Sequence, residues 1–599
     1  MSLQMQTLLV ANRGEIALRI MRTAARLGVR TVAVHTDLDA DAPHVRAADH
    51  AVRVPSYLDV DAVVAAAIET EADAVHPGYG FLSERSAFAA ALEAAGVTLV
   101  GPSAAVMEQM GRKDLARDVA VAAGVPVVPT GAEADYPVLV KAAAGGGGKG
   151  MRVVRSEAEM AEATAAAQRE AASAFGDDTM LVEKYVESGR HVEVQVMGDV
   201  HGTVLHLGER DCSTQRRHQK VLEEAPAPTL DEATRARVRQ AAVDLAAHVG
   251  YTGAGTVEFL LDNATGEFYF LEMNTRLQVE HPVTELVTGL DLVELQLRVA
   301  AGEPLPLAQD DVVLTGHAIE ARVYAEDSFG GFLPQAGRAT TVVWPTGPGV
   351  RVDQALESGQ TVSTAYDPML GKVVAHGPDR EAARRTLVAA LDRTAVLGLT
   401  TNAGFLRVLA ASEEFRDATI DTAWLDHHEV PAPDAGPARR AAARALHDAQ
   451  RERRGPFASD GFRLGGPPAP VVVDLDERVV LDGPTPVPAA ALVTPGRVEV
   501  ALEGQRFVFE PADARAPSAA VGDGTLLAPM PGTVLDVRVA AGEAVAEGQV
   551  LGTMEAMKME LSLTAPFAGT VTDVGAAAGA QVPLGAPLFV VEADAAGDA

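Results

Sequence analysis

Polar side chains occupy every second position of one short stretch near the middle of the chain, and their types suit chemistry on a small anion. They are Glu272, Asn274, Arg276, Gln278 and Glu280. If the backbone stays extended, all five project to one side, because side chains alternate across a strand. An ordinary half-buried strand alternates in the same way. Two carboxylates, an amide and a guanidinium, however, are the set needed to hold a metal, bind an anion and remove a proton.

A hairpin is predicted directly before this stretch. The run GTVEFLLDNATGEFYFLE reads as two strands around a turn at Asn263–Gly266. A turn centred near Thr265 sets Glu258 across from Glu272, where the two carboxylates could share a cation. The sequence therefore predicts a magnesium or manganese site at this pair.

A second candidate site is the glycine-rich run VLVKAAAGGGGKGMRVV. Its first strand ends at Lys141, and Gly146, Gly147 and Lys149 follow. Backbone N–H groups of glycines can turn toward a phosphate, and lysines supply positive charge. Gly150 stands where a Walker loop needs serine or threonine, so this is a different kind of phosphate loop. A flexible hairpin without a ligand stays the alternative for the glycines alone.

Near the C-terminus, Lys558 lies between Met557 and Met559. The sequence on one side, APMPGTVLDVRVAAGEAVAEGQVL (528–551), recurs on the other as APFAGTVTDVGAAAGAQVPLGAPL (565–588). Two copies of a short β unit with glycines at the same turns predict a β sandwich with quasi-two-fold symmetry. Lys558 is then expected on an exposed hairpin between the copies. A strand whose methionines fill a core is the alternative.

Composition limits the function classes. The chain has 599 residues, too many for one hydrophobic core, so several domains are expected. With 82 acidic and 50 basic residues its net charge is −32, which disfavours nucleic acid and anionic membranes as partners. A single cysteine, Cys212, allows no internal disulfide framework. Arg13 and Glu15 follow the short apolar run at the N-terminus, so no signal peptide or membrane anchor is expected and the protein is predicted to be cytoplasmic.

The first hundred residues alternate strands with amphipathic helices, as in a doubly wound α/β domain. After a Pro-rich linker at Pro431–Gly436, a basic helix is predicted at 437–455 and strands at about 469–511. An Ala/Pro-rich tether at 512–524 leads into the repeat.

Two motifs resemble known families. The sequence EAMKM around Lys558 resembles the biotinyl carrier family, which implies that a biotin protein ligase attaches biotin to this lysine. Lipoyl carriers share that fold, but usually lack the two flanking methionines. The glycine-rich run and LVEKYV (181–186) together resemble an ATP-grasp nucleotide site. This resemblance implies that ATP is held by Lys113, Lys141, Gly146, Gly147, Lys149, Glu183, Lys184 and His191, with the first two lysines at the phosphates and the last three residues at the adenosine.

Residues 5–428 resemble biotin carboxylase through the carboxylate stretch, HPGYGFLSE, ERDCSTQRRHQKVLEEAPAP and YDPMLGKVVAHG. In that family ATP activates bicarbonate for transfer to biotin. The resemblance implies a metal held by Glu258, Glu272 and Asn274, and bicarbonate held by Arg276, Gln278 and the Val279 backbone. It makes Glu280 the general base, and it places Lys220, His218 and Gln215 near the transferred phosphate and Arg351 at the biotin enolate.

The whole chain resembles the α subunit of acyl-CoA carboxylases, which implies a separate carboxyltransferase β subunit in a large hetero-oligomer. A pyruvate carboxylase-like subunit and a non-biotin ATP-grasp ligase are the alternatives, and the acyl group (acetyl, propionyl or methylcrotonyl) stays open. The segment between Lys113 and Lys141 and the middle domain are both shorter than is usual. The expected fold is α/β multidomain: a biotin carboxylase at 1–430 (doubly wound domain 1–115, ATP-grasp lid 125–205, C-terminal part 206–430), a β-rich docking domain at 437–511, a linker at 512–524 and a β-sandwich carrier at 525–593.

Overall fold

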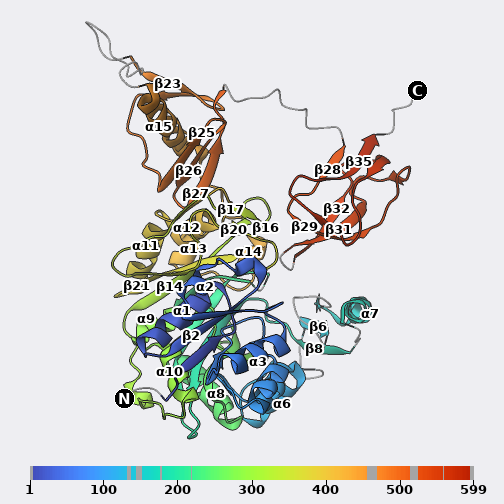
Figure 1. Ribbon diagram of the computed structural model, residues 1–599. Coiled ribbons are helices and arrows are strands. Elements are labelled where there is room, and N and C mark those ends of the chain that lie inside the picture. Colours follow the sequence, from blue (N-terminus) through green and yellow to red (C-terminus); the bar gives the residue numbers. More distant parts are fainter. Residues whose placement is uncertain are drawn as a thin grey trace.

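The computed structural model describes residues 4–130, 136–142, 151–175, 179–217, 219–454, 469–512, 524–556 and 559–593. Figure 1 shows a large body, a small lid beside it, a β-rich unit above it and a separate β sandwich at the C-terminal end. Within these residues, no helix combines the length and the apolar character that crossing a membrane requires.

The N-terminal domain is a parallel five-stranded sheet in the order β3-β2-β1-β4-β5. Its strands are β1 (Thr7–Val10), β2 (Arg30–His35), β3 (His50–Arg53), β4 (Ala74–His76) and β5 (Thr98–Leu99). All four residues of β1 are buried, as in a strand covered on both faces. Helices α1 (Gly14–Arg26), α3 (Val60–Glu69) and α4 (Ser86–Ala94) connect the strands. The predicted doubly wound domain is confirmed.

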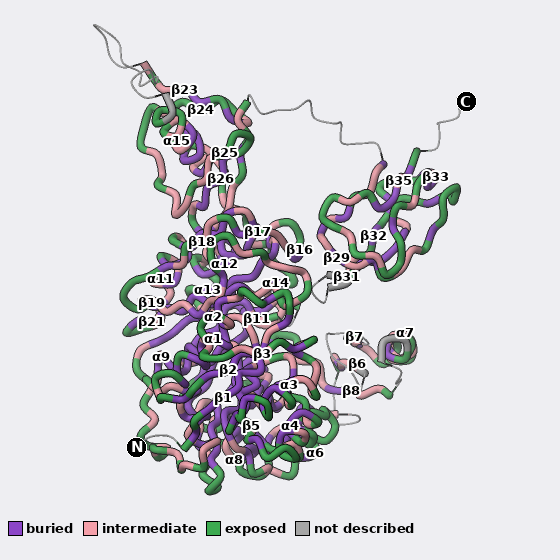
Figure 2. Tube along the Cα trace, viewed as in Figure 1, coloured by how far each residue is buried: buried purple, intermediate pink, exposed green. Residues whose placement is uncertain are grey.

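An antiparallel sheet of eight strands forms the centre of the body, in the order β13-β12-β9-β10-β11-β14-β21-β19. The strands are β9 (Gly189–Gly198), β10 (Val204–Arg216), β11 (Gln219–Ala225), β12 (Gly253–Asp262), β13 (Phe268–Asn274), β14 (His317–Tyr324), β19 (Val350–Gln354) and β21 (Met369–Gly377). Figure 2 shows mostly buried residues along this central region. One sheet therefore joins the middle of the chain to the C-terminal part of the body.

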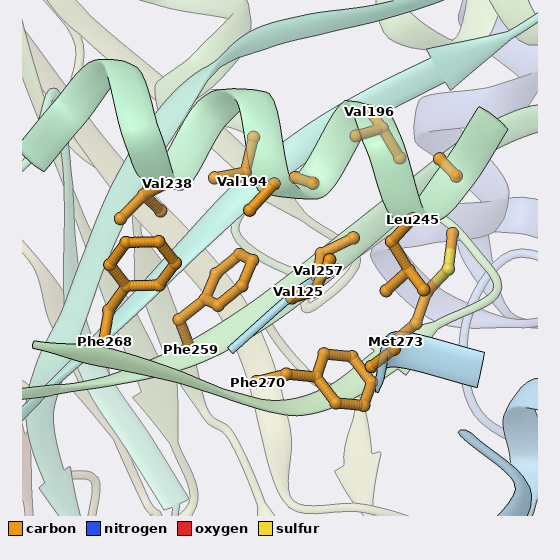
Figure 3. Close-up of a cluster of buried hydrophobic side chains, with 14 of the residues drawn as sticks. Val125, Val194, Val196, Val238, Leu245, Val257, Phe259, Phe268, Phe270 and Met273 are labelled. Atoms are coloured by element: carbon orange, nitrogen blue, oxygen red, sulfur yellow. The ribbon is translucent and has the colours of Figure 1, made fainter. Parts of the chain in front are cut away.

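Helix α8 (Glu232–His248) covers one face of this sheet. Figure 3 shows Val238 and Leu245 of the helix over Phe259, Phe268 and Phe270 of the hairpin strands. The rings of the first two phenylalanines meet edge to face, with centroids 5.5 Å apart. This packing fixes the hairpin on one face and leaves its other face for polar side chains.

The lid is smaller than predicted. It consists of β6 (Val138–Ala142), β7 (Met151–Val154) and β8 (Met180–Lys184) in the antiparallel order β7-β6-β8, with α7 (Glu157–Phe175) packed on them. The expected extent of 125–205 is wrong at its C-terminal end. Strand β9 pairs with β10 and β12, and all its residues are buried, so it belongs to the central sheet.

The β-rich unit begins with α15 (Ala435–Arg454), which agrees with the predicted basic helix. The helix packs on strands β23 (Val471–Asp474), β24 (Arg478–Leu481), β25 (Ala490–Thr494), β26 (Arg497–Leu502) and β27 (Gln505–Phe509). The unit is anchored to the body, because Ala501 packs with Ala395 and Leu397, and the Gly398 N–H donates to Glu499 Oε2 at 2.9 Å.

The C-terminal sandwich has two four-stranded sheets, β28-β35-β33-β30 and β32-β31-β29-β34. The strands are β28 (Thr525–Leu527), β29 (Gly532–Val537), β30 (Ala544–Val545), β31 (Val550–Ala556), β32 (Met559–Thr564), β33 (Gly569–Val574), β34 (Gln581–Val582) and β35 (Pro587–Ala593). Gly548 and its repeat equivalent Gly585 both have φ of +76°, so the two glycines adopt the same left-handed conformation in equivalent turns. The predicted repeat is confirmed. Ala556 pairs with Met559, and Lys558 itself lies outside the described residues.

His76 ties the N-terminal domain to the body and generates a prediction about acid stability. Its Nδ1 accepts from the Gly78 N–H at 3.0 Å, and its Nε2 lies 3.2 Å from Gln296 Oε1. Burial lowers the pKa of His76 to about 4. The native state therefore stays neutral at this site while the unfolded chain takes up a proton below pH 6.5, so stability falls as the pH falls from 6.5 to 4.

Between pH 7 and pH 5 we expect His76 alone to cost the body about 2 kcal/mol of unfolding free energy. In His76→Gln, which cannot titrate in this range, the drop in the melting temperature of the body over the same interval should be smaller than in the wild type. Equal drops in the two proteins would contradict the assignment.

Candidate active site

The predicted hairpin pairing is present. Glu258 of β12 lies directly opposite Glu272 of β13, and on its other side it lies opposite Glu193 of β9. Glu193 in turn lies opposite Arg210 of β10. Residues directly opposite one another in a ladder share a face of the sheet, so three carboxylates and a guanidinium form one row across four strands.

The extended backbone predicted for 272–280 is wrong beyond Asn274, where β13 ends. The chain turns and enters α9 (His281–Thr288), whose first turn contains a proline, with Glu280 as the residue before the helix. The side chains nevertheless converge. Arg276 donates to Gln278 Oε1 at 2.6 Å and to Asn274 Oδ1 at 2.9 Å. We call residues 275–280 the clamp loop.

Glu258 joins the clamp loop to the hairpin. Its Oε1 accepts from Asn274 Nδ2 at 2.9 Å and from Gln278 Nε2 at 3.0 Å. Its Oε2 lies 2.9 Å from His191 Nε2. The backbone turn therefore brings the amide of Gln278 back to the carboxylate row, which an extended strand would not do.

Lys220 of β11 is the centre of the charge cluster. Its Nζ donates to Glu193 Oε2 at 2.6 Å, to Glu258 Oε1 at 3.0 Å and to Glu280 Oε1 at 2.6 Å. Burial works against the charge of this ammonium, but the three carboxylates outweigh burial and raise the pKa of Lys220 well above its usual value. One largely buried cation therefore holds three buried anions together.

Glu280 is bound by two cations. Its Oε1 accepts from Lys220, and its Oε2 accepts from Arg322 Nη2 at 2.9 Å. Burial alone would raise the pKa of this carboxyl, but Lys220 and Arg322 hold it well below its ordinary value. Glu280 is therefore ionised at neutral pH, and it becomes an effective base only when one of these cations moves away.

The carboxylate row fits a divalent cation. Burial and the neighbouring Glu258 raise the pKa of Glu272, while Lys113 at the start of α6 (Lys113–Ala122) opposes them. Two carboxylates placed opposite each other, with the amide of Asn274 beside them, supply the oxygen ligands that magnesium prefers. His191 Nε2, Glu193 and Glu258 also place ligand atoms within 4.8 Å of one another.

Two of the described residues predicted to bind the nucleotide contact each other within the lid. Lys141 Nζ lies 2.6 Å from Glu183 Oε2, on adjacent strands β6 and β8. Lys184 binds Asp262 Oδ2 at 3.1 Å. His191, predicted at the adenosine, has its Nε2 2.9 Å from Glu258 Oε2 of the carboxylate row, and its role at the nucleotide stays a prediction. Gln215 pairs with Lys220 in the β10-β11 ladder. The remaining predicted positions, Gly146, Gly147, Lys149 and His218, lie outside the described residues.

Arg351 of β19 is not brought into the cluster around Lys220. It donates to Glu285 Oε2 at 2.7 Å and to Asp353 Oδ2 at 2.7 Å. It lines an open hollow of about 460 Å³ together with Arg19 and Arg22 of α1. Its role at biotin stays a prediction.

Sequence reasoning missed several charged residues of the site. Arg210 is completely buried and donates from Nε to Glu193 Oε1 at 2.5 Å. Arg276 Nε lies 3.0 Å from Glu84 Oε2, and that glutamate belongs to the HPGYGFLSE motif. A usable signal existed at Glu193, because a charge inside the apolar run of β9 needs a buried partner.

Removing the central ammonium should be costly. In Lys220→Met three buried carboxylates lose their shared cation, and we expect the body to lose about 3–5 kcal/mol of stability. The matched control is Lys184→Met, which removes a lysine that is 28% exposed and pairs with a single carboxylate, that of Asp262, and should cost under about 1 kcal/mol. Equal melting temperatures for the two variants would contradict the central role of Lys220.

Comparison with known families agrees with this architecture. The family described as "Biotin carboxylase, N-terminal domain" matches residues 4–107, "Carbamoyl-phosphate synthase L chain, ATP binding domain" matches 84–308, and "Biotin carboxylase C-terminal domain" matches 320–427. The family described as "Biotin-requiring enzyme" matches residues 524–591. The charge cluster therefore lies in the carboxylase part and Lys558 in the biotinyl part.

The propionyl-CoA carboxylase alpha chain of Ruegeria pomeroyi is 42% identical over 646 residues, which cover 92% of this chain and 95% of that protein. Subunit alpha of the mitochondrial methylcrotonoyl-CoA carboxylase of Arabidopsis thaliana is 51% identical over 449 residues. That match covers 71% of this chain but only 61% of the plant protein, and the rice and soybean counterparts are matched over similar shares.

Solved structures agree for the body. The biotin carboxylase of Campylobacter jejuni, solved as a complex with a nucleotide, is 44% identical, has a TM-score of 0.68 and covers 71% of this chain and 99% of its own. A biotin carboxylase domain from Hydrogenobacter thermophilus, solved with MgADP and bicarbonate, is 42% identical with the same TM-score. The chain contains the domains of a biotin carboxylase followed by a biotinyl domain, and it belongs to the family of acyl-CoA carboxylase α subunits.

Proposed function

We propose that this chain uses ATP and bicarbonate to carboxylate biotin attached to Lys558, and that a separate carboxyltransferase β subunit passes the carboxyl group to an acyl-CoA. The observation that carries the carboxylase half is the convergence of the clamp loop, the carboxylate row and Lys220 within hydrogen-bonding distance of one another. The relatives that match most of this chain are themselves named as α subunits or chains of such carboxylases.

Bicarbonate is a poor electrophile, so phosphorylation by ATP must come first, giving carboxyphosphate and ADP. A magnesium or manganese ion, held by Glu258, Glu272 and Asn274, would neutralise phosphate charge. Arg276 is suited to hold the bicarbonate, since its guanidinium lies at the site and offers a planar fork. Gln278 and the Val279 backbone lie beside it in the clamp loop and orient the anion.

Glu280 removes the proton of bicarbonate in this proposal. As long as Lys220 and Arg322 both bind it, the carboxylate is a weak base. A phosphate that draws Lys220 toward itself would free Glu280 Oε1 and strengthen the base where the proton must be removed. The same lysine would then serve two steps, stabilising the transferred phosphate and releasing the base. Arg351 would act later, at the biotin ring.

The division of labour is supported by the arrangement of the chain. The sandwich has its own hydrophobic core, and Leu333 is the one residue of the body recorded as packing against that core among the described residues, so the carrier can move as a unit. The β-rich unit is fixed to the body and exposes Val472, Val480 and Val508. We propose that this unit, within 437–511, docks the β subunit, and that the linker at 512–524 lets the carrier reach both active sites.

Two substitutions test the carboxylase half. Arg276→Ala removes the anion clamp and Glu280→Gln removes the base, and each should lower bicarbonate-dependent ATP cleavage by a factor of about 10²–10³. Arg237→Ala serves as the control, because this exposed arginine pairs with Glu267 away from the cluster. Turnover near the wild-type value in both site variants would contradict the proposal.

A second experiment tests the division of labour. The purified chain should carboxylate free biotin and leave propionyl-CoA and methylcrotonyl-CoA unchanged until the β subunit is added. Replacing Val472 and Val480 by Asp should weaken association with that subunit at unchanged ATP cleavage. Lys558→Arg should associate normally but carboxylate no acyl-CoA, since it cannot carry biotin. Acyl-CoA carboxylation by the isolated chain, or by Lys558→Arg with its partner, would overturn the assignment.

A further inference from the structure

Lys372 of β21 is a completely buried lysine for which the reaction proposed above has no use. Its Nζ donates to the backbone carbonyl of Val279 at 2.7 Å. The nearest carboxylate oxygen recorded for it is Glu15 Oε1, at 3.6 Å. A fully buried lysine is rare, because desolvation of an ammonium is costly unless it is paired.

The contacts of Lys372 link three parts of the body. Glu15 is on α1 of the N-terminal domain, and the ring of Tyr79, 5.8 Å from the ammonium, follows β4 of the same domain. Val279 belongs to the clamp loop. Lys372 itself belongs to the C-terminal part, opposite Asp353 of β19 and Arg322 of β14 in the sheet. One ammonium therefore lies where all three parts meet.

The clamp loop needs support from side chains, because it lies beyond the end of β13 and outside the sheet. No ladder pairing holds residues 275–280 in the described structure, so their backbone carbonyls depend on other donors. His281 Nδ1 lies 2.8 Å from the Gln278 carbonyl, and Lys372 binds the next carbonyl, that of Val279. These two bonds lie between Arg276 and Glu280, the proposed anion clamp and base.

We propose that Lys372 is a positioning residue that holds the clamp loop in the geometry that binds bicarbonate. The inference rests on the function proposed for Arg276 and Glu280. Lys372 touches no reacting atom in this proposal and acts through the Val279 carbonyl. Buried polar groups of this kind are retained at a cost in stability when a site needs its backbone fixed.

If the role of Lys372 were only structural, the kinetic effect of replacing it would be different. If Lys372 only filled space, its replacement by methionine, which has a similar length and no charge, would change stability but treat ATP and bicarbonate alike. A positioning role predicts a selective effect on the bicarbonate step, since the ATP ligands on the lid do not contact the clamp loop carbonyl.

The test uses the full chain and measures steady-state ATP cleavage at varied bicarbonate and varied ATP. In Lys372→Met we expect kcat/KM for bicarbonate to fall roughly 10- to 100-fold, the loss typical of a charged hydrogen bond, while the KM for ATP changes less than about twofold. Lys372→Arg keeps a cation and a donor and should lie closer to the wild type. Burial raises the pKa of Glu15 to about 7, so Glu15→Gln, which keeps the shape, removes only a partial negative charge near the ammonium. A smaller loss with the same selectivity is expected.

The matched control is Arg380→Met. Arg380 binds Glu224 Oε2 at 2.6 Å and the Phe415 carbonyl at 2.7 Å. It is therefore a partly buried cation bound to a backbone carbonyl, and no contact with the clamp loop is recorded for it among the described residues. It should lower the melting temperature without changing the KM for bicarbonate.

The selective loss in Lys372→Met and Glu15→Gln, absent from Arg380→Met, would support the inference. A wild-type bicarbonate response in Lys372→Met, or equal effects on both substrates in it, would overturn the inference and leave the proposed function intact. If Lys372→Met does not fold, the Glu15→Gln measurement decides in the same way. A wild-type chain without bicarbonate-dependent ATP cleavage would instead refute the proposed function itself.

Discussion

The attraction between Lys220 and three buried carboxylates is the interaction on which the rest of the active site depends. Glu193, Glu258 and Glu280 come from two strands and a loop, and without a shared cation their like charges could not stay together in a buried setting. The eight-stranded sheet supplies the geometry, because its register sets Glu193 opposite Glu258. The apolar packing of α8 on the other face keeps that register fixed.

The same attraction creates a chemical problem that the site must solve. A carboxylate bound by Lys220 and Arg322 is a weak base, yet Glu280 is the group placed beside the anion clamp. In the proposed mechanism a substrate phosphate competes for Lys220, whereas Arg322, which also binds Glu223, stays in place. In the proposed mechanism the resting cluster therefore keeps Glu280 a weak base until a substrate phosphate draws Lys220 away.

The sequence predicted what depends on local periodicity and missed what depends on distant pairing. The hairpin placed Glu258 opposite Glu272 because a turn of known length fixes the register. The sandwich was predicted because two copies of a short β unit carry glycines at the same turns. The clamp loop was predicted as strand because alternation persists through it, although a helix with Pro282 in its first turn begins directly after it. Glu193 and Arg322 were missed because only the sheet order, with β9 beside β12 and β14 beside β11, brings them to the site.

Lys372 shows how the separate parts become one catalytic unit. The anion clamp lies between the N-terminal domain and the C-terminal part, and each contributes a group that fixes it: Glu84 binds Arg276, and Lys372 binds the Val279 carbonyl. The lid and the carrier, by contrast, have small cores of their own. Rigid support is therefore concentrated around the proposed bicarbonate site. The lid and the carrier, which are proposed to bring ATP and biotin to that site, have cores of their own and can move relative to it.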